Sequence, residues 1–331
     1  MGWQPGEQLR NGQYTIIREL GRGRFGITYL ARDKPGETCV IKTLSDDLIN
    51  QLIPSDLKRL EDKIWQEATK LAHCQHPHIV KLKESFKEGD RVCLAMEHIA
   101  GETLEHLPNK ILPESLALEY IRQIGSALTC VHEKGFVHRD VKPANIVLRA
   151  GKSEVILIDF GLARGFDNPL TTVQASTADG FAPLELYHID SEQKPYTDVY
   201  SLSATLYVLL TGTIPASAMD SSLQKAQLIP PKQLNSQISD RTNTAILEGL
   251  KLAPEDRPQT INDWLKLLPS GHQNLVLPQI KPVLFWGIVA AIATVLALFR
   301  NQNLVLPQIE PALFWTIVGA IAAVLALFKR S

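Results

Sequence analysis

The chain has 331 residues, which allows one large domain or two modest ones with a sizeable hydrophobic core. Hydrophobic residues make up 45% and charged residues 21% of the sequence, a composition that argues against a disordered, collagen-like or coiled-coil protein. The formal net charge of -1 provides no basic field, so no nucleic-acid partner is expected.

Residues 1–13 are predicted to be an N-terminal segment. They lack the charged start and apolar stretch of a secretory signal, so the chain is expected to begin in the cytoplasm. The four cysteines lie far apart without a Cys-x-x-Cys pair, which predicts neither a disulfide framework nor a zinc site.

The region after this segment changes from strand-like to helical patterns. One helical stretch, 57–73, interrupts strand-like runs at 14–20, 28–33, 38–44 and 92–98. Helical patterns dominate further on, at 116–134, 197–211 and 243–252. The sequence therefore predicts an α+β fold with a small sheet and one helix first, and a larger helical part after it.

The composition breaks at residues 268–271, and the tail that follows contains a duplication. Residues 273–300 and 302–329 match at 22 of 28 positions. After a linker at 269–282, the uncharged runs 283–299 and 312–328 each span about 25 Å as helices, which predicts two transmembrane helices. A short loop at 300–311 joins them, and residues 329–331 form a basic C-terminus that returns to the cytoplasm.

The tail leaves two alternatives open, a buried helical hairpin in a soluble core and re-entrant or interfacial helices. Small residues occur four positions apart, at Ala290 and Thr294 and at Gly319 and Ala323, a spacing that lets membrane helices pack closely. The lipid bilayer is thus one expected partner, and self-association through the two helices is another.

The first polar cluster is a glycine-rich turn between two strands, with a lysine further on. Gly21, Gly23 and Gly26 allow a hairpin to lie flat over phosphates, with its backbone N–H groups directed at anionic oxygens. Lys42 ends the apolar strand that follows and could reach those phosphates. Taken alone, an ordinary glycine turn is the better explanation of these glycines, and a lone lysine at a strand end is usually just solvated.

Two further clusters are more specific. The run His138-Arg139-Asp140-Val141-Lys142-Pro143-Ala144-Asn145 places a carboxylate, a cation and an amide on one tight loop. Asp159 follows an apolar strand at 156–158, where its carboxylate can hold a metal ion or merely end the strand in a turn. In this order and at this spacing, the clusters together indicate phosphate chemistry.

From about residue 14 to residue 268 the sequence resembles the eukaryotic-type (Hanks-type) serine/threonine protein kinases, in a bacterial membrane-anchored form. The resemblance implies a bilobal fold with a β-rich N-lobe and a helical C-lobe. It implies ATP and Mg²⁺ as cofactors, with Mn²⁺ as a substitute, and Asn145 and Asp159 as the metal ligands. Asp140 would accept the proton of the incoming hydroxyl, and Lys142 would stabilise the transferring phosphoryl group and indicates serine/threonine specificity.

The same resemblance assigns the nucleotide-binding residues. Lys42 would hold the α- and β-phosphates and pair with a glutamate on the N-lobe helix. The resemblance identifies this glutamate as Glu67, because Glu67 precedes His76-Pro77-His78, which resembles the passage from that helix to the next strand. Without the resemblance, the sequence does not distinguish Glu67 from Glu61. Met96 would be the gatekeeper of the adenine pocket. The remaining expected ATP contacts are Leu20, Gly21, Gly23, Gly26, Thr28, Glu97 and Ile99. Thr28 and Val40 replace the usual valine and alanine, which favours a weaker nucleotide affinity.

Four further residues are expected to hold the fold or to regulate it. Asp198 would brace the catalytic loop, and Arg257 would pair with Glu185. The usual Ala-Pro-Glu ending is altered here to Ala182-Pro183-Leu184-Glu185, which puts substrate docking at this segment in doubt. Arg139 would bind a phosphate on the activation segment, for which Thr171, Thr172, Ser176 and Thr177 are the candidate autophosphorylation sites.

The resulting hypothesis is a serine/threonine protein kinase in a multi-pass membrane location, with a cytoplasmic kinase domain and protein substrates. One alternative is a membrane-tethered pseudokinase scaffold that binds partners, although Lys42, Asp140, Asn145 and Asp159 are all present. The other is a small-molecule phosphotransferase, which generally lacks the Lys142 spacing and the pair of Glu185 and Arg257.

Overall fold

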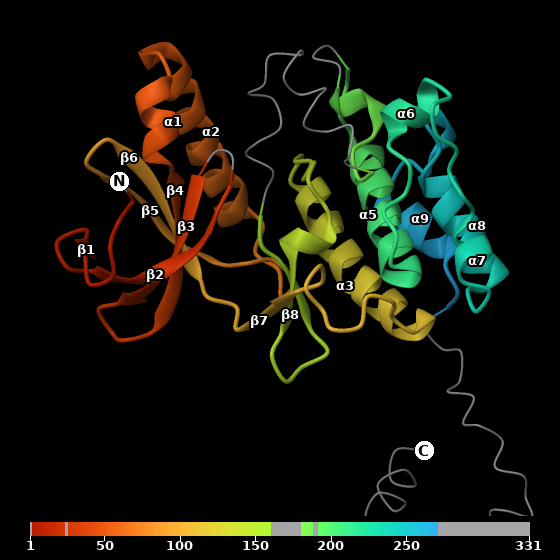
Figure 1. Cartoon of the computed structure of the whole chain (residues 1–331), viewed down its shortest axis with the longest axis horizontal. Helices are drawn as coiled ribbons and strands as arrows, with labels where there is room; N and C mark the ends of the chain where they lie inside the picture. The colour runs from red at the N-terminus through yellow and green to blue at the C-terminus, as the bar shows by residue number, and fades with distance from the viewer. Residues whose placement is uncertain (1, 24–25, 160–179, 188–190, 271–331) are drawn as a thin grey trace, which may run out of the picture. The chain divides into compact units, whose positions relative to one another are not determined.

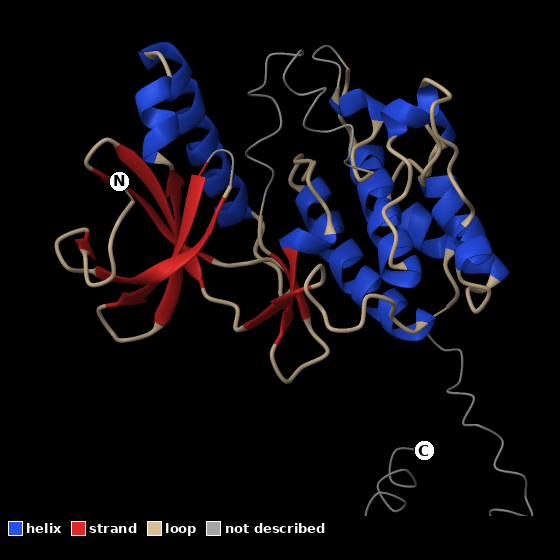
Figure 2. Cartoon of the chain, in the orientation of Figure 1, coloured by secondary structure: helices blue, strands red, loops and turns tan. Residues whose placement is uncertain are grey.

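The computed structural model describes residues 2–23, 26–159, 180–187 and 191–270. This part has a β-rich N-terminal lobe and a helical C-terminal lobe, which confirms the predicted bilobal architecture (Figures 1 and 2). The predicted transmembrane segments and the candidate sites Thr171, Thr172, Ser176 and Thr177 lie outside the described residues. Within the described ranges, no helix has the length and apolar character needed to cross a membrane.

The N-lobe is built on a six-stranded antiparallel sheet with the order β1-β2-β3-β4-β6-β5. Alternate residues of β3 (Ile27, Tyr29 and Ala31) are fully buried, as expected for a strand with one face on a core. The strands are β1 Gln8–Leu9, β2 Tyr14–Arg22, β3 Gly26–Asp33, β4 Thr38–Leu44, β5 Leu82–Glu88 and β6 Arg91–Glu97.

Two strands of this sheet were not predicted, for different reasons. β1 has only two residues, so no periodicity can reveal it, yet Leu9 is buried and the strand pairs with β2. β5 is an edge strand whose only large apolar residues are Leu82 and Phe86, and the charged residues between them hide the pattern. Residues of the N-terminal segment thus belong to the N-lobe sheet.

Two helices cover this sheet on one side, α1 Asp46–Gln51 and the longer α2 Pro54–His73 (Figure 1). Pro54 at the first helical position suits the start of α2, because its fixed φ is helical and its missing N–H is not needed there. One stripe of α2 packs against Leu44, Val92 and Leu94. The buried residues of this stripe are Leu60, Ile64, Glu67, Ala68 and Leu71.

The C-lobe is organised around α5 Pro195–Thr211, which contacts α3, α8 and α9. Four of its buried hydroxyl side chains, those of Ser201, Ser203, Thr205 and Thr211, donate to carbonyl groups one turn earlier and are thus satisfied inside the helix. Gly249 lets α8 approach closely, since a methyl group there would collide with Ser203. The other helices are α3 Glu114–Glu133, α6 Ala218–Ser222, α7 Pro231–Leu234, α8 Asp240–Gly249 and α9 Ile261–Leu267.

A second, three-stranded sheet lies where the lobes meet, with β8 Ile146–Arg149 between β7 Gly101–Thr103 and β9 Val155–Leu157. Leu157 connects this sheet to the N-lobe: its N–H donates to the carbonyl of His78 and its own carbonyl accepts from Val80, both at 2.9 Å. The contact fixes the chain that follows α2 relative to the strands that carry the catalytic loop.

Candidate active site

A cavity of about 580 Å³ lies between the two lobes. The glycine-rich hairpin and β4 line the cavity on the N-lobe side, and β8 with Asp159 lines it on the C-lobe side. The chain after β6, which connects the lobes, lines it between them. Its lining includes Leu20, Gly21, Thr28, Val40, Lys42, Met96, Glu97, Ile99, Ala144, Val147, Ile158 and Asp159. Most residues predicted to contact the nucleotide therefore meet at one cavity.

Two predicted glycines, Gly23 and Gly26, are not among the lining residues but shape the hairpin above it. The N–H of Gly23 donates to the carbonyl of Gly26 at 2.9 Å. A Cβ atom at Gly26 would lie 2.5 Å from the carbonyl oxygen of Thr43, so only glycine allows β3 and β4 to approach this closely.

Lys42 connects the two lobes inside the cavity. Its Nζ lies 3.3 Å from Glu67 Oε1 on α2 and 2.7 Å from Asp159 Oδ1 after β9. Burial alone would lower the pKa of Lys42, but the carboxylates of Asp159 and Glu67 outweigh burial and hold the pKa above its usual range. Lys42 is thus a permanent cation in a position to meet anionic phosphate groups.

The structure also separates the two glutamates that the residues alone did not. Glu67 is 2% exposed and lies on the buried stripe of α2. Glu61 bonds instead to Lys87, at 3.0 Å on the outer surface. Helical spacing explains the difference, because six residues are not a whole number of turns.

Asp140, Lys142 and Asn145 form a compact cluster on the loop before β8. Lys142 Nζ lies 3.1 Å from Asp140 Oδ2. Asn145, at the end of a short 3₁₀ helix over Pro143–Asn145, donates through Nδ2 to the carbonyl oxygen and to Oδ2 of Asp140, both at 2.8 Å. These contacts orient the Asp140 carboxylate, as a base that accepts a proton from a substrate hydroxyl requires.

Asp198, in the first turn of α5, binds the backbone of this loop. It is fully buried and accepts from the backbone N–H groups of His138 and Arg139, both at 2.8 Å, and from His132 Nε2 at 2.7 Å. Burial would raise the pKa of Asp198, but the hydrogen bond from His132 and the neighbouring groups lower it overall. The φ of +75° at Arg139 is an unfavourable conformation that these bonds stabilise.

The residues expected to bind a metal ion suit Mg²⁺. Because Nδ2 of Asn145 bonds to Asp140, its amide oxygen points away from that carboxylate, and Asp159 would supply a second oxygen ligand. The described residues contain no group of three or more histidine, cysteine or acidic side chains that could form a complete metal cage. Magnesium commonly binds in this way, through one or two protein oxygens together with substrate phosphates.

A buried ion pair lies between the chain before α5 and the chain after α8. Arg257 Nη1 and Nη2 lie 2.7 and 2.9 Å from the two carboxylate oxygens of Glu185, and both residues are almost fully buried. Thr197 Oγ1 also donates to Glu185, at 3.1 Å. The predicted partners are thus in contact, away from the lining of the interlobe cavity.

Sequence reasoning missed His132 and Thr197, the additional partners of Asp198 and Glu185. His132 lies 66 residues from Asp198 along the chain, so no local motif connects them. Its place in the last turn of the predicted helix at 116–134 was the only available signal, and a histidine there more often just interacts with the carbonyl end of its own helix.

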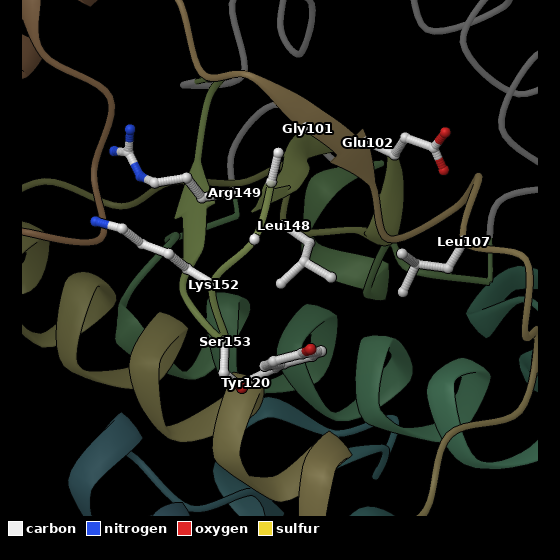
Figure 3. A pocket seen from close by; sticks show the side chains of 10 residues that line it. Gly101, Glu102, Leu107, Tyr120, Leu148, Arg149, Lys152 and Ser153 are labelled. Carbon is white, nitrogen blue, oxygen red and sulfur yellow. The ribbon is translucent and has the colours of Figure 1, made fainter. Parts of the chain in front are cut away.

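A second cavity, of about 510 Å³, is lined by residues of β7, β8 and the turn that follows β8 (Figure 3). It shares Gly101 and Glu102 with the interlobe cavity. Arg149 and Lys152 lie at one end in this view, Glu102 lies at the other, and Tyr120 lies close to Ser153. Lys42, Asp159 and the catalytic loop do not line it, so the interlobe cavity is the candidate active site.

Comparisons with known proteins point to one family. The model of the protein kinase domain matches residues 14–266. Serine/threonine-protein kinase C of Synechocystis sp. is 32% identical over 81% of this chain and 51% of its own length. Serine/threonine-protein kinase PkaA of Streptomyces coelicolor is 31% identical over 76% of this chain and 48% of its own length.

Solved structures show the same fold. The apo form of PpkA-294 has a TM-score of 0.69 at 27% identity and covers 81% of this chain and 99% of its own. The kinase domain of Mycobacterium tuberculosis PknI has a TM-score of 0.60 at 22% identity over 80% of this chain and 98% of its own.

The chain therefore belongs to the protein kinase family, and its domain is of the serine/threonine type. This confirms the family predicted from the motifs. The chain spans about half the length of these two bacterial relatives and less of others, such as 38% of a probable serine/threonine-protein kinase of Clostridium perfringens.

Proposed function

We propose that this chain transfers the γ-phosphoryl group of ATP to serine and threonine hydroxyls of proteins. The observation that carries the proposal is the position of Lys42, which lines the interlobe cavity together with Asp159 and contacts both Asp159 of the C-lobe and Glu67 of the N-lobe. The cluster of Asp140, Lys142 and Asn145 supports it, because these residues supply a base, a cation and a metal ligand on one loop.

In the proposed reaction the acceptor hydroxyl oxygen forms a bond to the γ-phosphorus while the bond from that phosphorus to the bridging oxygen of ADP breaks. Asp140 takes the hydroxyl proton, and Lys142 neutralises charge on the phosphoryl oxygens. Lys42 holds the non-transferred phosphates. Asn145 and Asp159 would hold Mg²⁺, which when bound would neutralise the phosphate oxygens.

Transfer of labelled γ-phosphate to serine or threonine in a generic protein tests the activity. We expect incorporation with the wild-type chain and background levels with Asp140→Asn, at unchanged ATP binding. ATP binding without transfer would instead indicate a scaffold, and transfer only to a small molecule would indicate the other phosphotransferase class.

We also propose that the apolar segments 283–299 and 312–328 anchor the kinase domain to a membrane as two helices, with the domain in the cytoplasm. Confinement to a surface would raise the effective concentration of one copy for another and favour phosphorylation between copies. Removal of residues 273–331 should shift the chain from the membrane to the soluble fraction and slow trans-phosphorylation; unchanged fractionation and rate would contradict the anchor.

Autophosphorylation at Thr171, Thr172, Ser176 or Thr177 is the regulation that we propose, with Arg139 as the receiving cation. Arg139 Nε is buried and has no hydrogen-bond partner within the described part of the chain. Burial, opposed by Asp198, lowers the pKa of Arg139, so a phosphate would relieve an unfavourable charge. Mass spectrometry after incubation with Mg-ATP should find phosphate on at least one of the four residues, and none modified would end this proposal.

A further inference from the structure

The first residues of the N-terminal segment lie against the glycine-rich hairpin. The N–H of Trp3 donates to Tyr29 Oη on β3 at 3.1 Å, and the rings of these two residues have their centroids 5.3 Å apart. A Cβ atom at Gly2 would lie 2.6 Å from the same Tyr29 Oη and 3.7 Å from Ile27 Cδ1. The segment therefore contacts the part of β3 that directly follows the glycine-rich turn.

These contacts lie on the face of β3 that is turned away from the interlobe cavity. Ile27 and Tyr29 are 0% exposed and belong to a core cluster against which Trp3 packs. Thr28, between them, lines the interlobe cavity and pairs with Lys42 of β4. Because neighbouring side chains of a strand point to opposite faces, Trp3 and a bound nucleotide would contact the two faces of one strand.

The other strand of the hairpin, the second half of β2, has little packing of its own. Residues 18–22 are all exposed, although Leu20 and Gly21 line the interlobe cavity. The pairing of β2 with β3 is irregular here, with two register shifts over residues 16–21. A segment with few buried apolar contacts is ordered mainly by the elements that it pairs with. The position of Leu20 and Gly21 at the cavity thus depends on β3.

Arg91, at the start of β6, fixes the ring of Trp3. The guanidinium carbon of Arg91 lies 5.0 Å from the centroid of the Trp3 ring, an arrangement in which the cation is attracted to the ring face. Trp3 thereby connects β3 with β6, the strand that leads into the chain between the lobes. Both ends of this connection belong to elements that line the nucleotide cavity.

We propose that Trp3 is a positioning residue for the nucleotide, which holds β3, and through β3 the glycine-rich hairpin, in the position that binds ATP. The inference rests on the proposed kinase activity and names a residue outside the cavity that sets its affinity for nucleotide. A hairpin that is already held in its binding position loses less conformational freedom when the ligand binds, and affinity rises accordingly. Because Trp3 lies on the other face of β3, it would stabilise the bound nucleotide equally before and during phosphoryl transfer.

Trp3→Ala in the full chain tests the proposal. The KM for ATP and the Kd of Mg-ATP should both rise about fivefold, with kcat within about twofold of wild type, because a uniform contribution to binding is lost. Trp3→Phe keeps a ring against Tyr29 and should stay within about twofold of wild type in all three quantities. Hydrogen exchange should become faster at the amides of residues 18–22 in Trp3→Ala but not in Trp3→Phe.

Leu9→Ala is the matched control. Leu9 belongs to the same N-terminal segment and the same core cluster, but it pairs with Tyr14, at the end of β2 away from the glycine-rich turn. With each protein assayed equally far below its own melting temperature, Leu9→Ala should leave the KM for ATP within about twofold of wild type. Its melting temperature should fall at least as much as that of Trp3→Ala, because Leu9 is fully buried.

Three results would overturn the positioning role: an unchanged KM in Trp3→Ala, a loss confined to kcat, or an equal rise of KM in Leu9→Ala. The last result would show that any loss of packing in the segment weakens nucleotide binding. A wild-type chain that binds no Mg-ATP would instead contradict the proposed kinase activity, on which the inference rests.

Discussion

Two ionic clusters in this domain use the same chemistry in different surroundings. In the C-lobe, Glu185 and Arg257 satisfy each other almost completely, and Arg257 also donates to the carbonyls of Lys251 and Leu252 at 2.7 and 2.9 Å. In the interlobe cavity, Lys42 is shared between Glu67 and Asp159, and both Lys42 and Asp159 remain partly accessible.

The two clusters differ in whether their hydrogen-bond donors and acceptors are all used by other protein groups. The pair of Glu185 and Arg257 uses its donors and acceptors on protein groups, so it fixes a conformation and can bind nothing else. Lys42 carries three donors and lines a cavity with Asp159, so an anionic ligand can compete for it. A buried ion pair thus stabilises the fold when it is saturated and serves a reaction when it borders a cavity.

The largest effect should come from Lys42→Met. The variant removes the cation that faces the phosphates, and we expect phosphoryl transfer to fall by at least about 10³-fold while the domain stays folded. Initial rates with labelled ATP and the melting temperature measure the two properties separately. Lys87→Met, at an exposed pair on the same lobe, should leave the rate unchanged; a parallel loss of melting temperature in Lys42→Met would show that the cluster is mainly structural.

Arg257→Met should instead lower the free energy of unfolding by about 3 to 5 kcal/mol, because Glu185 is left as a buried charge without its counter-ion. Chemical denaturation measures the loss. The double variant Glu185→Leu, Arg257→Met should recover part of it, since both charges are gone, but the carbonyls of Lys251 and Leu252 still lose a donor. A double variant no more stable than the single one would mean that the carbonyl contacts dominate.

Asp198→Asn should lower the free energy of unfolding by about 2 to 3 kcal/mol near neutral pH. The NH2 group of the new amide cannot accept a hydrogen bond, so at least one of the three donors to Asp198 loses its partner. Folding lowers the pKa of Asp198. The ionised carboxylate therefore contributes its full stabilisation of the fold above the ordinary carboxyl pKa of about 3.9, and this stabilisation is lost as the pH falls through the lower folded pKa. The difference in melting temperature between wild type and variant should shrink below about pH 4. A difference that stays constant down to about pH 3 would rule out this linkage.

The sequence was most informative where chemistry is local. Asp140, Lys142 and Asn145 lie within six residues, so one short motif predicted a cluster that the structure brings together. The long strands and helices followed from periodicity because each buries one face. The same patterns predicted a small β-rich part followed by a larger helical part, whereas the bilobal kinase fold came from the family resemblance.

The rest depended on contacts that no local pattern encodes. Edge strand β5 has too few apolar residues to be recognised, and β1 is too short. His132 completes the site of Asp198 from a distant helix. These features depend on tertiary packing, which propensities do not determine.

The smallest effect that we expect concerns the two glutamates of α2 that the residues alone could not separate. Glu67→Gln keeps the shape of the side chain but removes the charge opposite Lys42, so the lysine is positioned less firmly and transfer should fall about tenfold. Glu61→Gln removes an outward pair with Lys87 and should not change the rate. Single-turnover rates at saturating ATP compare the two variants on one helix. Equal rates would show that Asp159 alone suffices to position Lys42, and the N-lobe helix would then have no part in aligning the phosphates.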